Sequence, residues 1–484
     1  MESRKVYNRR YIGNRESMSY VLFSSSKTFH IKEFETRFVI DVLKIDLGWN
    51  SIIAFTNGIW DIINDGLLGA LIDKTHTRWG KFKPYLFTYA SAGTIFTTLY
   101  WLTPLLFNRD PRNLGKAAFW LLLAMILESF TTVRDTAETG LISCVSPSPD
   151  DRVRMYTMAE VVGAIWQDIP GVVMGVLIDL VNHNRASFSM EKIYISMGTF
   201  TMVTAGVLAM FFCLYAKERV SQAAERHNYR EGLRAILRNK PLLILLLTDF
   251  LGGFQVETWE HNYFIDVLGS ESLRNVVRIP GVPLSFLSYA YINKARERYS
   301  VKSLWILGTH LKDILALAIF AIGSVGGIYH TVVPMVAMLM IRNLFYMGTL
   351  SINKIIPREI VLDAVEYAEW NTGFRSEGAI LSARSMTMKI TRNVINSMTT
   401  FIMKKTDYSL DAGFGQQSAR AKYALFAMSY GLPALLGLLS IIPKLFYDLT
   451  GEKRARMYEE LKEIRRLRQM DYDKLNQEES EATQ

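Results

Sequence analysis

Apolar residues along this chain fall into twelve blocks, and charged or Gly/Pro-containing segments separate each block from the next. A helix needs about 20 mainly apolar residues to cross a bilayer, and blocks such as 85–107, 193–216 and 423–446 reach that length. The pattern therefore predicts an all-α integral membrane protein with twelve transmembrane helices. We place the helices at about 17–45, 50–73, 85–107, 117–145, 156–182, 191–216, 241–265, 276–292, 303–327, 331–353, 379–405 and 421–447.

The longest polar segment, residues 217–240, lies between the sixth and seventh predicted helices and is rich in Arg and Glu. It is the predicted cytoplasmic linker between an N-terminal six-helix bundle, 1–216, and a C-terminal six-helix bundle, 241–447. Residues 448–484 are a charged tail, for which we expect a solvated helix or disorder.

Two short segments at equivalent helix ends share a pattern of side chains. DKTHTRW follows the second predicted helix at 73–79, and NKARERY follows the eighth at 293–299. Asp or Asn, Lys, Arg and an aromatic residue recur at a constant offset. The repeat suggests a duplication, so we expect the two bundles to be pseudo-symmetric.

The net charge of +9 does not indicate a nucleic-acid partner, because the basic residues alternate with the apolar blocks. They collect in the loops of one side, which places both termini in the cytoplasm and the chain in the cell (inner) membrane as a multi-pass protein. Cys144 and Cys213 lie in or beside apolar blocks and are expected to be packed thiols. We find no catalytic motif and expect neither an enzyme nor a cofactor. No cleaved signal peptide is expected, and the protein should be monomeric.

The second predicted helix carries polar residues within an otherwise apolar span. Asp61, Asn64 and Asp65 are spaced three and four apart, so on a helix they share one face. Two carboxylates there repel each other, and the pair must share a proton, find a basic partner or bind a cation. Oxygen ligands suit Na⁺ at Asp61 and Asp65, with H⁺ as the substitute. The alternative is that these residues are only the polar lining of a water-filled cavity.

The first predicted helix is unusually charged and places Lys27, His30, Phe34, Arg37 and Asp41 on one face. A basic cavity wall would favour an anionic solute, because guanidinium groups bind carboxylates in a bidentate manner. The alternative is internal salt bridges to carboxylates of the same bundle. Further basic groups that favour the anionic solute are Arg134, Arg342, Arg384 and Arg392, and the carboxylates that could pair with them are Glu138, Glu160 and Asp168.

The segment WDIINDGLLGALIDKTHTRWGKFKPY, residues 60–85, resembles the hallmark of the glycoside-pentoside-hexuronide:cation symporters, the melibiose-carrier branch of the major facilitator superfamily. That hallmark is D-x-x-N-D in the second helix, followed by D-x-x-x-x-R-W-G-[KR]-x-[KR]-P. A second signature of the family is similar to DAVEYAEWNTGFRSEG, residues 363–378. The resemblance covers nearly the whole chain. It implies a transporter with the major facilitator fold that carries a sugar or sugar derivative together with Na⁺ or H⁺.

By this resemblance Asp61, Asn64, Asp65 and Thr132 match the cation site of the family. The residues that correspond to its substrate site are less well matched. Asp135 matches a sugar-binding carboxylate, and Lys389 matches a lysine near the cation site, where it could neutralise the carboxylates. Thr28 stands where the melibiose branch has an aspartate, and Glu160 stands where it has an arginine, so galactoside specificity is not implied. Thr132 and Asp135 are three apart and could point together into the bundle.

A cytoplasmic gate is predicted where charged groups of the two halves can pair in one state and separate in the other. The expected members are Asp73, Arg78 and Lys81 from the first half and Asp363, Arg375 and Glu377 from the second. The alternative is that these cations only set topology. Two other functions remain open: a lysophospholipid:cation symporter, which needs an apolar lateral groove, and a non-transporting membrane sensor or interaction protein on the same fold.

Overall fold

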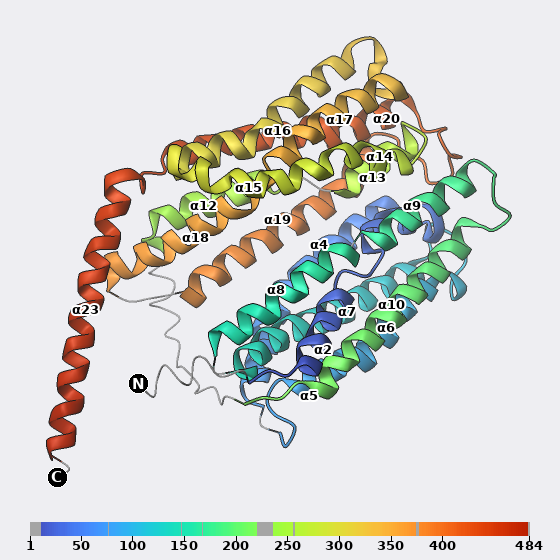
Figure 1. Ribbon diagram of the computed structural model, residues 1–484. Coiled ribbons are helices and arrows are strands. Elements are labelled where there is room, and N and C mark those ends of the chain that lie inside the picture. The colour runs from blue at the N-terminus through green and yellow to red at the C-terminus, as the bar shows by residue number, and fades with distance from the viewer. Residues whose placement is uncertain are drawn as a thin grey trace. The chain divides into compact units, whose positions relative to one another are not determined.

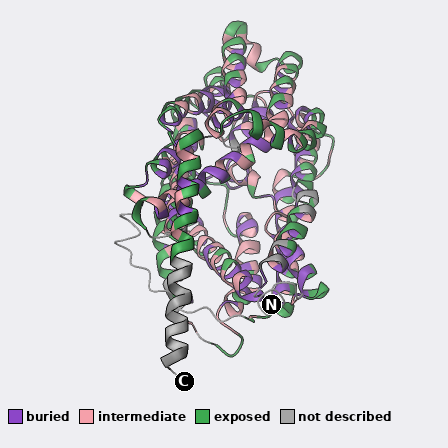
Figure 2. Cartoon of the chain, turned by 60° about the vertical axis from the view of Figure 1, so that its left-hand side comes forward, coloured by how far each residue is buried: buried purple, intermediate pink, exposed green. Residues whose placement is uncertain are grey.

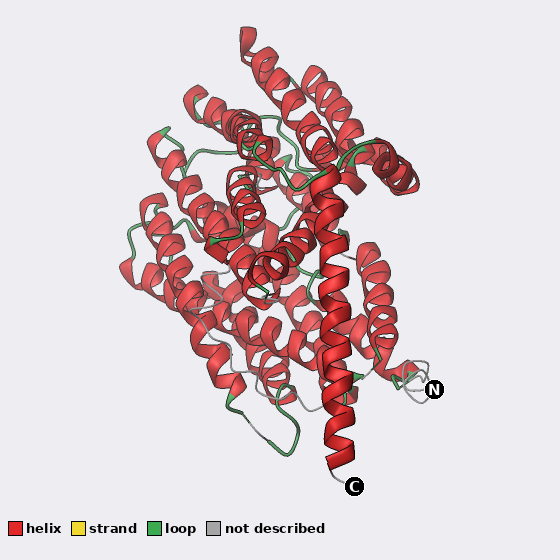
Figure 3. Cartoon of the chain, turned by 90° about the vertical axis from the view of Figure 1, so that its left-hand side faces the viewer, coloured by secondary structure: helices red, strands yellow, loops and turns green. Residues whose placement is uncertain are grey.

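The computed structural model describes residues 11–75, 77–146, 148–166, 168–219, 236–254, 257–373 and 377–482. Throughout these ranges the regular structure is helical, as Figure 3 shows, and the one β-type pairing is an isolated bridge between Thr77 and Gly80. The predicted all-α fold is therefore confirmed for the described residues.

Each predicted membrane helix has a counterpart within the described ranges (Figure 1). Four spans have the length and hydropathy needed to cross a membrane, and α17 with α18 is a fifth if this pair, bent by 46°, counts as one. The first half contains α2 (Asn14–Ser26), α3 (Glu35–Phe38), α4 (Leu47–Asp73), α5 (Lys83–Thr88), α6 (Thr94–Leu102), α7 (Leu114–Val145), α8 (Pro149–Trp166), α9 (Ile169–Asn182) and α10 (Met190–Tyr215). The second half contains α12 (Lys240–Gly252), α13 (Glu257–Asp266), α14 (Ser272–Arg278), α15 (Val282–Arg298), α16 (Val301–Ser324), α17 (Val332–Gly348), α18 (Leu350–Thr372), α19 (Glu377–Lys405), α20 (Ala419–Phe426), α21 (Leu432–Leu439), α22 (Ile441–Leu445) and α23 (Gly451–Ala482).

Several of the predicted helices are interrupted rather than continuous, and three of the breaks fall in the first, fifth and seventh helices. The first breaks between α2 and the 3-10 helix Lys32–Phe34, the fifth between α8 and α9, and the seventh between α12 and α13. Local chemistry accounts for the breaks in the fifth and seventh helices, because Pro170 lies in the first turn of α9 and the pair Gly252–Gly253 ends α12. Interrupted helices leave main-chain polar groups within the span, and in transporters such breaks commonly line solute and ion sites.

The chain forms two compact units. The first comprises residues 1–225, 256–275 and 393–425, and the second comprises 226–255, 276–392 and 426–484. Residues 220–235 of the predicted linker lie outside the described ranges, so the predicted boundary at 217–240 stays a prediction. In both units, helices carry buried residues on one side and exposed residues on the other (Figure 2).

The start of α4 in the first unit is fixed by its N-cap residue, Asp46. The carboxylate accepts hydrogen bonds from the main-chain N–H groups of Gly48 and Trp49 and from Lys404 Nζ at 2.9 Å. Burial alone would raise the pKa of Asp46, but the hydrogen bonds from Lys404 and the two N–H groups bring it below its ordinary value.

The tail is a helix, α23, and its first turns are not fully solvated. Met457 and Leu461 are buried in the core of the second unit, whereas most other described side chains of α23 are exposed (Figure 2). Arg454 of α23 binds Asp363 Oδ2 at 2.9 Å and Glu359 Oε1 at 2.7 Å, both on α18. The expectation of a solvated tail was therefore wrong for the first turns of α23, because Met457, Leu461 and Arg454 pack this part of the helix against the second unit.

Replacing Arg454 with alanine should lower the free energy of unfolding by about 1–3 kcal/mol, because it leaves buried carboxylates with fewer donors. This loss of unfolding free energy should be smaller than for carboxylates that Arg454 alone contacts. Arg296 also binds Glu359, and Tyr458 also donates to Asp363. The melting temperature of the purified protein in detergent measures the effect. Arg466→Ala, at an exposed pair with Glu463, is the matched control and should change little. Equal melting temperatures in the two variants would show that the Arg454 contacts add no stability.

Candidate functional site

The predicted cation-site residues lie where α4 packs against α7 in the first unit. Asn64 Nδ2 donates to Thr132 Oγ1 at 3.0 Å, and Thr132 Oγ1 donates to Asp65 Oδ1 at 2.9 Å. Asp61, Asn64 and Thr132 are buried, while the apolar residues on the other faces of α4, including Ile63 and Leu67, are exposed. The helix thus turns its polar face inward and its apolar face outward, as a membrane-embedded helix does.

The chemistry of this cluster suits a small hard cation. Its side chains offer carboxylate, amide and hydroxyl oxygens, which are the donors that alkali and alkaline-earth ions prefer. The described residues contain no group of three or more His, Cys, Asp or Glu side chains that could hold a metal ion. The structure brings Asn64, Asp65 and Thr132 together, and occupancy by Na⁺ or H⁺ stays a prediction.

The break in the first helix places Lys27 beside Glu138 of α7. Lys27 Nζ lies 2.8 Å from both carboxylate oxygens of Glu138, and Tyr20 donates to the same carboxylate at 3.2 Å. The hydroxyl of Thr28 donates to the carbonyl of Ser25 at 3.1 Å. Lys27 therefore forms an internal salt bridge. Such a bridge was the alternative to a basic cavity wall in the sequence analysis.

Asp135 is paired with its sequence neighbour. Arg134 Nε donates to Asp135 Oδ1 at 2.7 Å, and the guanidinium lies over the ring of Tyr89 at 5.3 Å. The Asp135 side chain is 55% exposed, whereas Thr132 is 5% exposed. Residues three apart differ by about 60° around a helix. Thr132 therefore lies within the contact with α4, and Asp135 lies at the edge of that contact. Glu160 on α8 is exposed.

Arg37 of α3 is buried in an ion cluster of the first unit. Its guanidinium contacts Asp41 at 2.8 Å, Asp266 at 2.5 Å and the hydroxyl of Tyr408 at 3.1 Å, and Tyr408 also donates to Asp266 at 2.7 Å. Arg37 and Asp41 lie four residues apart, so this part of the cluster is an i,i+4 pair. Asp266 and Tyr408 were not identified from the sequence, although an aspartate at the end of an apolar span is itself a signal of a buried partner.

The predicted gate residues of the first half lie in and beside a tight turn after α4. Gly80 has a φ of +106°, which favours glycine, and Glu218 caps the turn by accepting from the main-chain N–H groups of Lys81, Phe82 and Lys83. Arg78 is exposed and lies over the ring of Trp79. The backbone of Asp73 ends α4; its side chain lies outside the described part of the structure.

The predicted gate residues of the second half have a different setting. Asp363 is fully buried and bound by Arg454 and Tyr458 of α23, within its own unit. Arg375 lies outside the described residues, and so does the side chain of Glu377. Lys389 is half-buried in α19. The gate, and a role for Lys389 beside the carboxylates, stay predictions.

A family model described as MFS/sugar transport protein matches residues 18–451 of the chain. The chain belongs to this family. The predicted major facilitator fold of twelve transmembrane helices, and the resemblance noted from residues 60–85 and 363–378, are therefore confirmed.

Relatives of this MFS/sugar transport protein include carriers of known name. The isoprimeverose transporter of Lactiplantibacillus pentosus is 24% identical over 90% of this chain and 88% of its own length. The inner membrane symporter YicJ of Escherichia coli K12 is 24% identical over 94% of each chain. Among solved structures, the nucleoside transporter NupG superposes with a TM-score of 0.56 at 14% identity, covering 90% of this chain and 99% of its own, which supports the fold alone.

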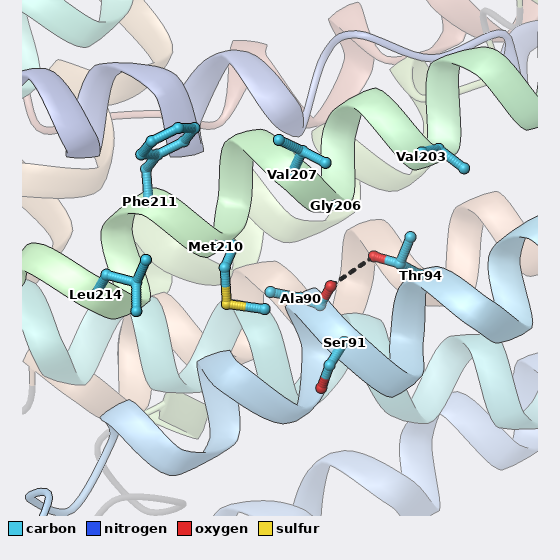
Figure 4. Close-up of a pocket in the computed structure, with 9 residues that line it drawn as sticks. All are labelled: Ala90, Ser91, Thr94, Val203, Gly206, Val207, Met210, Phe211 and Leu214. Carbon is cyan, nitrogen blue, oxygen red and sulfur yellow. Dashed lines mark hydrogen bonds between the residues drawn. The ribbon is translucent and has the colours of Figure 1, made fainter.

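One apolar groove of this sugar transport protein lies between α10 and the helical stretch that leads into α6 (Figure 4). Val203, Val207 and Phe211 line one wall. The hydroxyls of the other wall bind their own backbone: Ser91 donates to the carbonyl of Phe87, and Thr94 to that of Ala90. A groove of this kind suits acyl chains of the bilayer and offers few groups to a sugar.

Proposed function

We propose that this protein is a secondary active transporter that carries a sugar or glycoside across the cell membrane together with Na⁺ or H⁺, by alternating access. The observation that carries the proposal is the hydrogen-bonded chain from buried Asn64 through buried Thr132 to the partly buried Asp65. A cation that offsets the charge of Asp61 and Asp65 would favour movement of the loaded carrier, which couples the cation gradient to the solute. The protein would act as a monomer with both termini in the cytoplasm and no enzymatic step.

A neutral sugar or glycoside is the substrate that the charge distribution favours. An anionic solute such as a hexuronide would need cations that lack a carboxylate partner. Four of the basic side chains named above have such a partner: Lys27 binds Glu138, Arg37 binds Asp41 and Asp266, Arg134 binds Asp135, and Arg384 binds Asp249. A fifth, Arg342, lies over the ring of Tyr430. The names of the relatives cover both classes of solute, since they include an isoprimeverose transporter and a glucuronide carrier protein homolog.

Counterflow in proteoliposomes tests the function. Liposomes loaded with unlabelled isoprimeverose, lactose, a glucuronide or a lysophospholipid are diluted into the labelled compound, with and without Na⁺ and at several pH values. Counterflow of a neutral sugar that depends on Na⁺ or on pH is the expected result. Exchange of the lysophospholipid alone would establish the lipid alternative. The absence of exchange with all four compounds would favour a sensor or interaction protein.

Replacing Thr132 with valine should weaken cation activation of sugar uptake by about 10- to 100-fold. The hydroxyl bridges Asn64 and Asp65, and a hydrogen bond to a charged group contributes about 1.5–3 kcal/mol. Ser129→Ala is the matched control, because Ser129 lies one turn earlier on α7 and bonds Trp60 rather than a carboxylate. The cation concentration that gives half-maximal uptake is the quantity to measure. Equal values for the two variants would place the cation elsewhere.

A further inference from the structure

A row of three ionisable side chains lies buried in the second unit, where the proposed function assigns no role. Lys444 of α22 is 2% exposed, and His310 and Asp313 of α16 are 4% and 3% exposed. Lys444 Nζ lies 2.7 Å from His310 Nε2, and His310 Nδ1 lies 2.9 Å from Asp313 Oδ2. Ionisable groups at such depth in a membrane bundle are costly, and the imidazole connects the amine to the carboxylate.

The surroundings hold both ends of the row in place. Lys444 Nζ also donates to Thr309 Oγ1 at 2.8 Å and to the carbonyl of Trp305 at 3.4 Å, and it lies 4.8 Å from the centre of the Trp305 ring. At the other end, a Cβ on Gly437 would come within 2.5 Å of Asp313 Oδ2. Glycine at 437 thus lets the carboxylate lie directly against α21.

Two protonation states fit these positions equally well. In the ionic state the Lys444 ammonium donates its three protons to Thr309, Trp305 and His310 Nε2, and the Nδ1–H of His310 donates to ionised Asp313. In the neutral state one proton has moved from Lys444 Nζ to His310 Nε2, and the Nδ1 proton has moved to Asp313 Oδ2. Neither atoms nor total charge change, so the row can pass a proton without moving its heavy atoms.

A third state, in which His310 itself carries one more proton, does not fit. The imidazolium carries an N–H on both nitrogens, so its Nε2–H would face the Lys444 ammonium at 2.7 Å, donor against donor and cation against cation. This contact must open. Lys444 is carried by α22, a five-residue helix separated from α21 at Ser440, so opening this contact requires a shift of that short helix relative to α16.

Among the described residues, Lys312 of α16 itself and Asp249 of α12 are two further charged groups that act on the row. Both have partners: Lys312 lies over the Tyr346 ring at 5.2 Å, and Asp249 accepts from Arg384 at 2.7 Å. Imidazole is the side chain whose ordinary pKa, about 6.5, lies between pH 5 and 8, so we place the added proton on His310.

We propose that Lys444, His310 and Asp313 form a proton-exchange site, and that protonation of His310 detaches α22 from α16. The ligand is H⁺. The site gives the transporter a pH-dependent conformational step that is separate from cation binding at Asp61 and Asp65.

Thermal unfolding of the full-length protein in detergent, followed from about pH 8 to pH 5, tests the site without a transported solute. The wild-type melting temperature should fall by several degrees as the pH falls, because the folded row resists protonation of His310 and the unfolded chain does not. His310→Gln should lose this acid-dependent decrease. Lys302→Ala is the matched control: Lys302 also joins α16 to α22, through the carbonyl of Leu445 at 2.6 Å, but it lies outside the row and carries no imidazole. It should melt lower at every pH and keep the wild-type slope. An unchanged slope in His310→Gln would overturn the proposal.

Nitrogen NMR of ¹⁵N-labelled wild-type protein gives an independent readout if His310→Gln does not fold. Among the described residues His310 is the histidine hydrogen-bonded to a lysine amine, so a correlation between imidazole and lysine nitrogens identifies its signals. Both ring nitrogens should become protonated as the pH falls, and the correlation with Lys444 should then disappear. A correlation that persists at full strength down to about pH 5 would refute the proposal.

Discussion

Replacing Asp65 with asparagine is expected to abolish accumulation of sugar against its gradient. Asp65 Oδ1 accepts the hydroxyl of Thr132 in the buried contact of α4 with α7, and the substitution removes one of two carboxylate charges there. A charge about 4 Å from a bound cation contributes about 4 kcal/mol at an effective dielectric constant of about 20. Its loss corresponds to roughly a thousandfold weaker cation binding. A physiological gradient would then no longer load the site.

The measurement is Na⁺- or H⁺-driven uptake by proteoliposomes, with counterflow of the same sugar recorded beside it. Glu191→Gln removes a surface carboxylate that pairs with Arg109 and should leave both activities unchanged. The variant at Asp65 should lose gradient-driven accumulation while the protein still folds, which its melting temperature reports. Cation-dependent accumulation at the wild-type level in Asp65→Asn would remove Asp65 from the coupling site.

The cluster of polar residues on α4 could be predicted from the sequence because its main signal is local. Asp61, Asn64 and Asp65 follow a helical spacing within one apolar span, so periodicity alone places them on one face. The contact with Thr132 came from the family resemblance and is present as a hydrogen bond. Asp135 shows what helical spacing alone cannot predict. It lies only three residues after buried Thr132 on α7, yet its side chain is about half exposed and pairs with Arg134.

The breaks in the first and seventh helices and the partners of Arg37 could not be predicted in this way. Apolar content continues across a break, so a hydropathy pattern reports the span but not its interruption after Ser26 or Gly252. Asp266 and Tyr408 lie 229 and 371 positions from Arg37 along the chain, and only the tertiary fold brings them together. Periodicity indicates which face of a helix is polar, but it does not indicate which residues of other helices contact that face.

Replacing Arg37 with methionine should lower the free energy of unfolding by about 3–5 kcal/mol, the second large effect that we expect. The substitution leaves Asp41 and Asp266 buried together without their common cation, and removal of one partner from a buried ion pair has a cost of this size. Arg109→Met is the matched control, because Arg109 forms an exposed pair with Glu191 that should contribute at most about 1 kcal/mol.

The same variant decides between the two roles of Arg37, since a structural cation and a solute-binding cation affect different measurements. If Arg37 stabilises the fold, Arg37→Met melts lower, and adding Asp266→Leu recovers part of the loss, because the double variant buries one carboxylate fewer. If Arg37 binds an anionic solute, the melting temperature stays at the wild-type value and the KM for uptake rises instead. The buried position of Arg37, with contacts to Asp41, Asp266 and Tyr408, favours the first result.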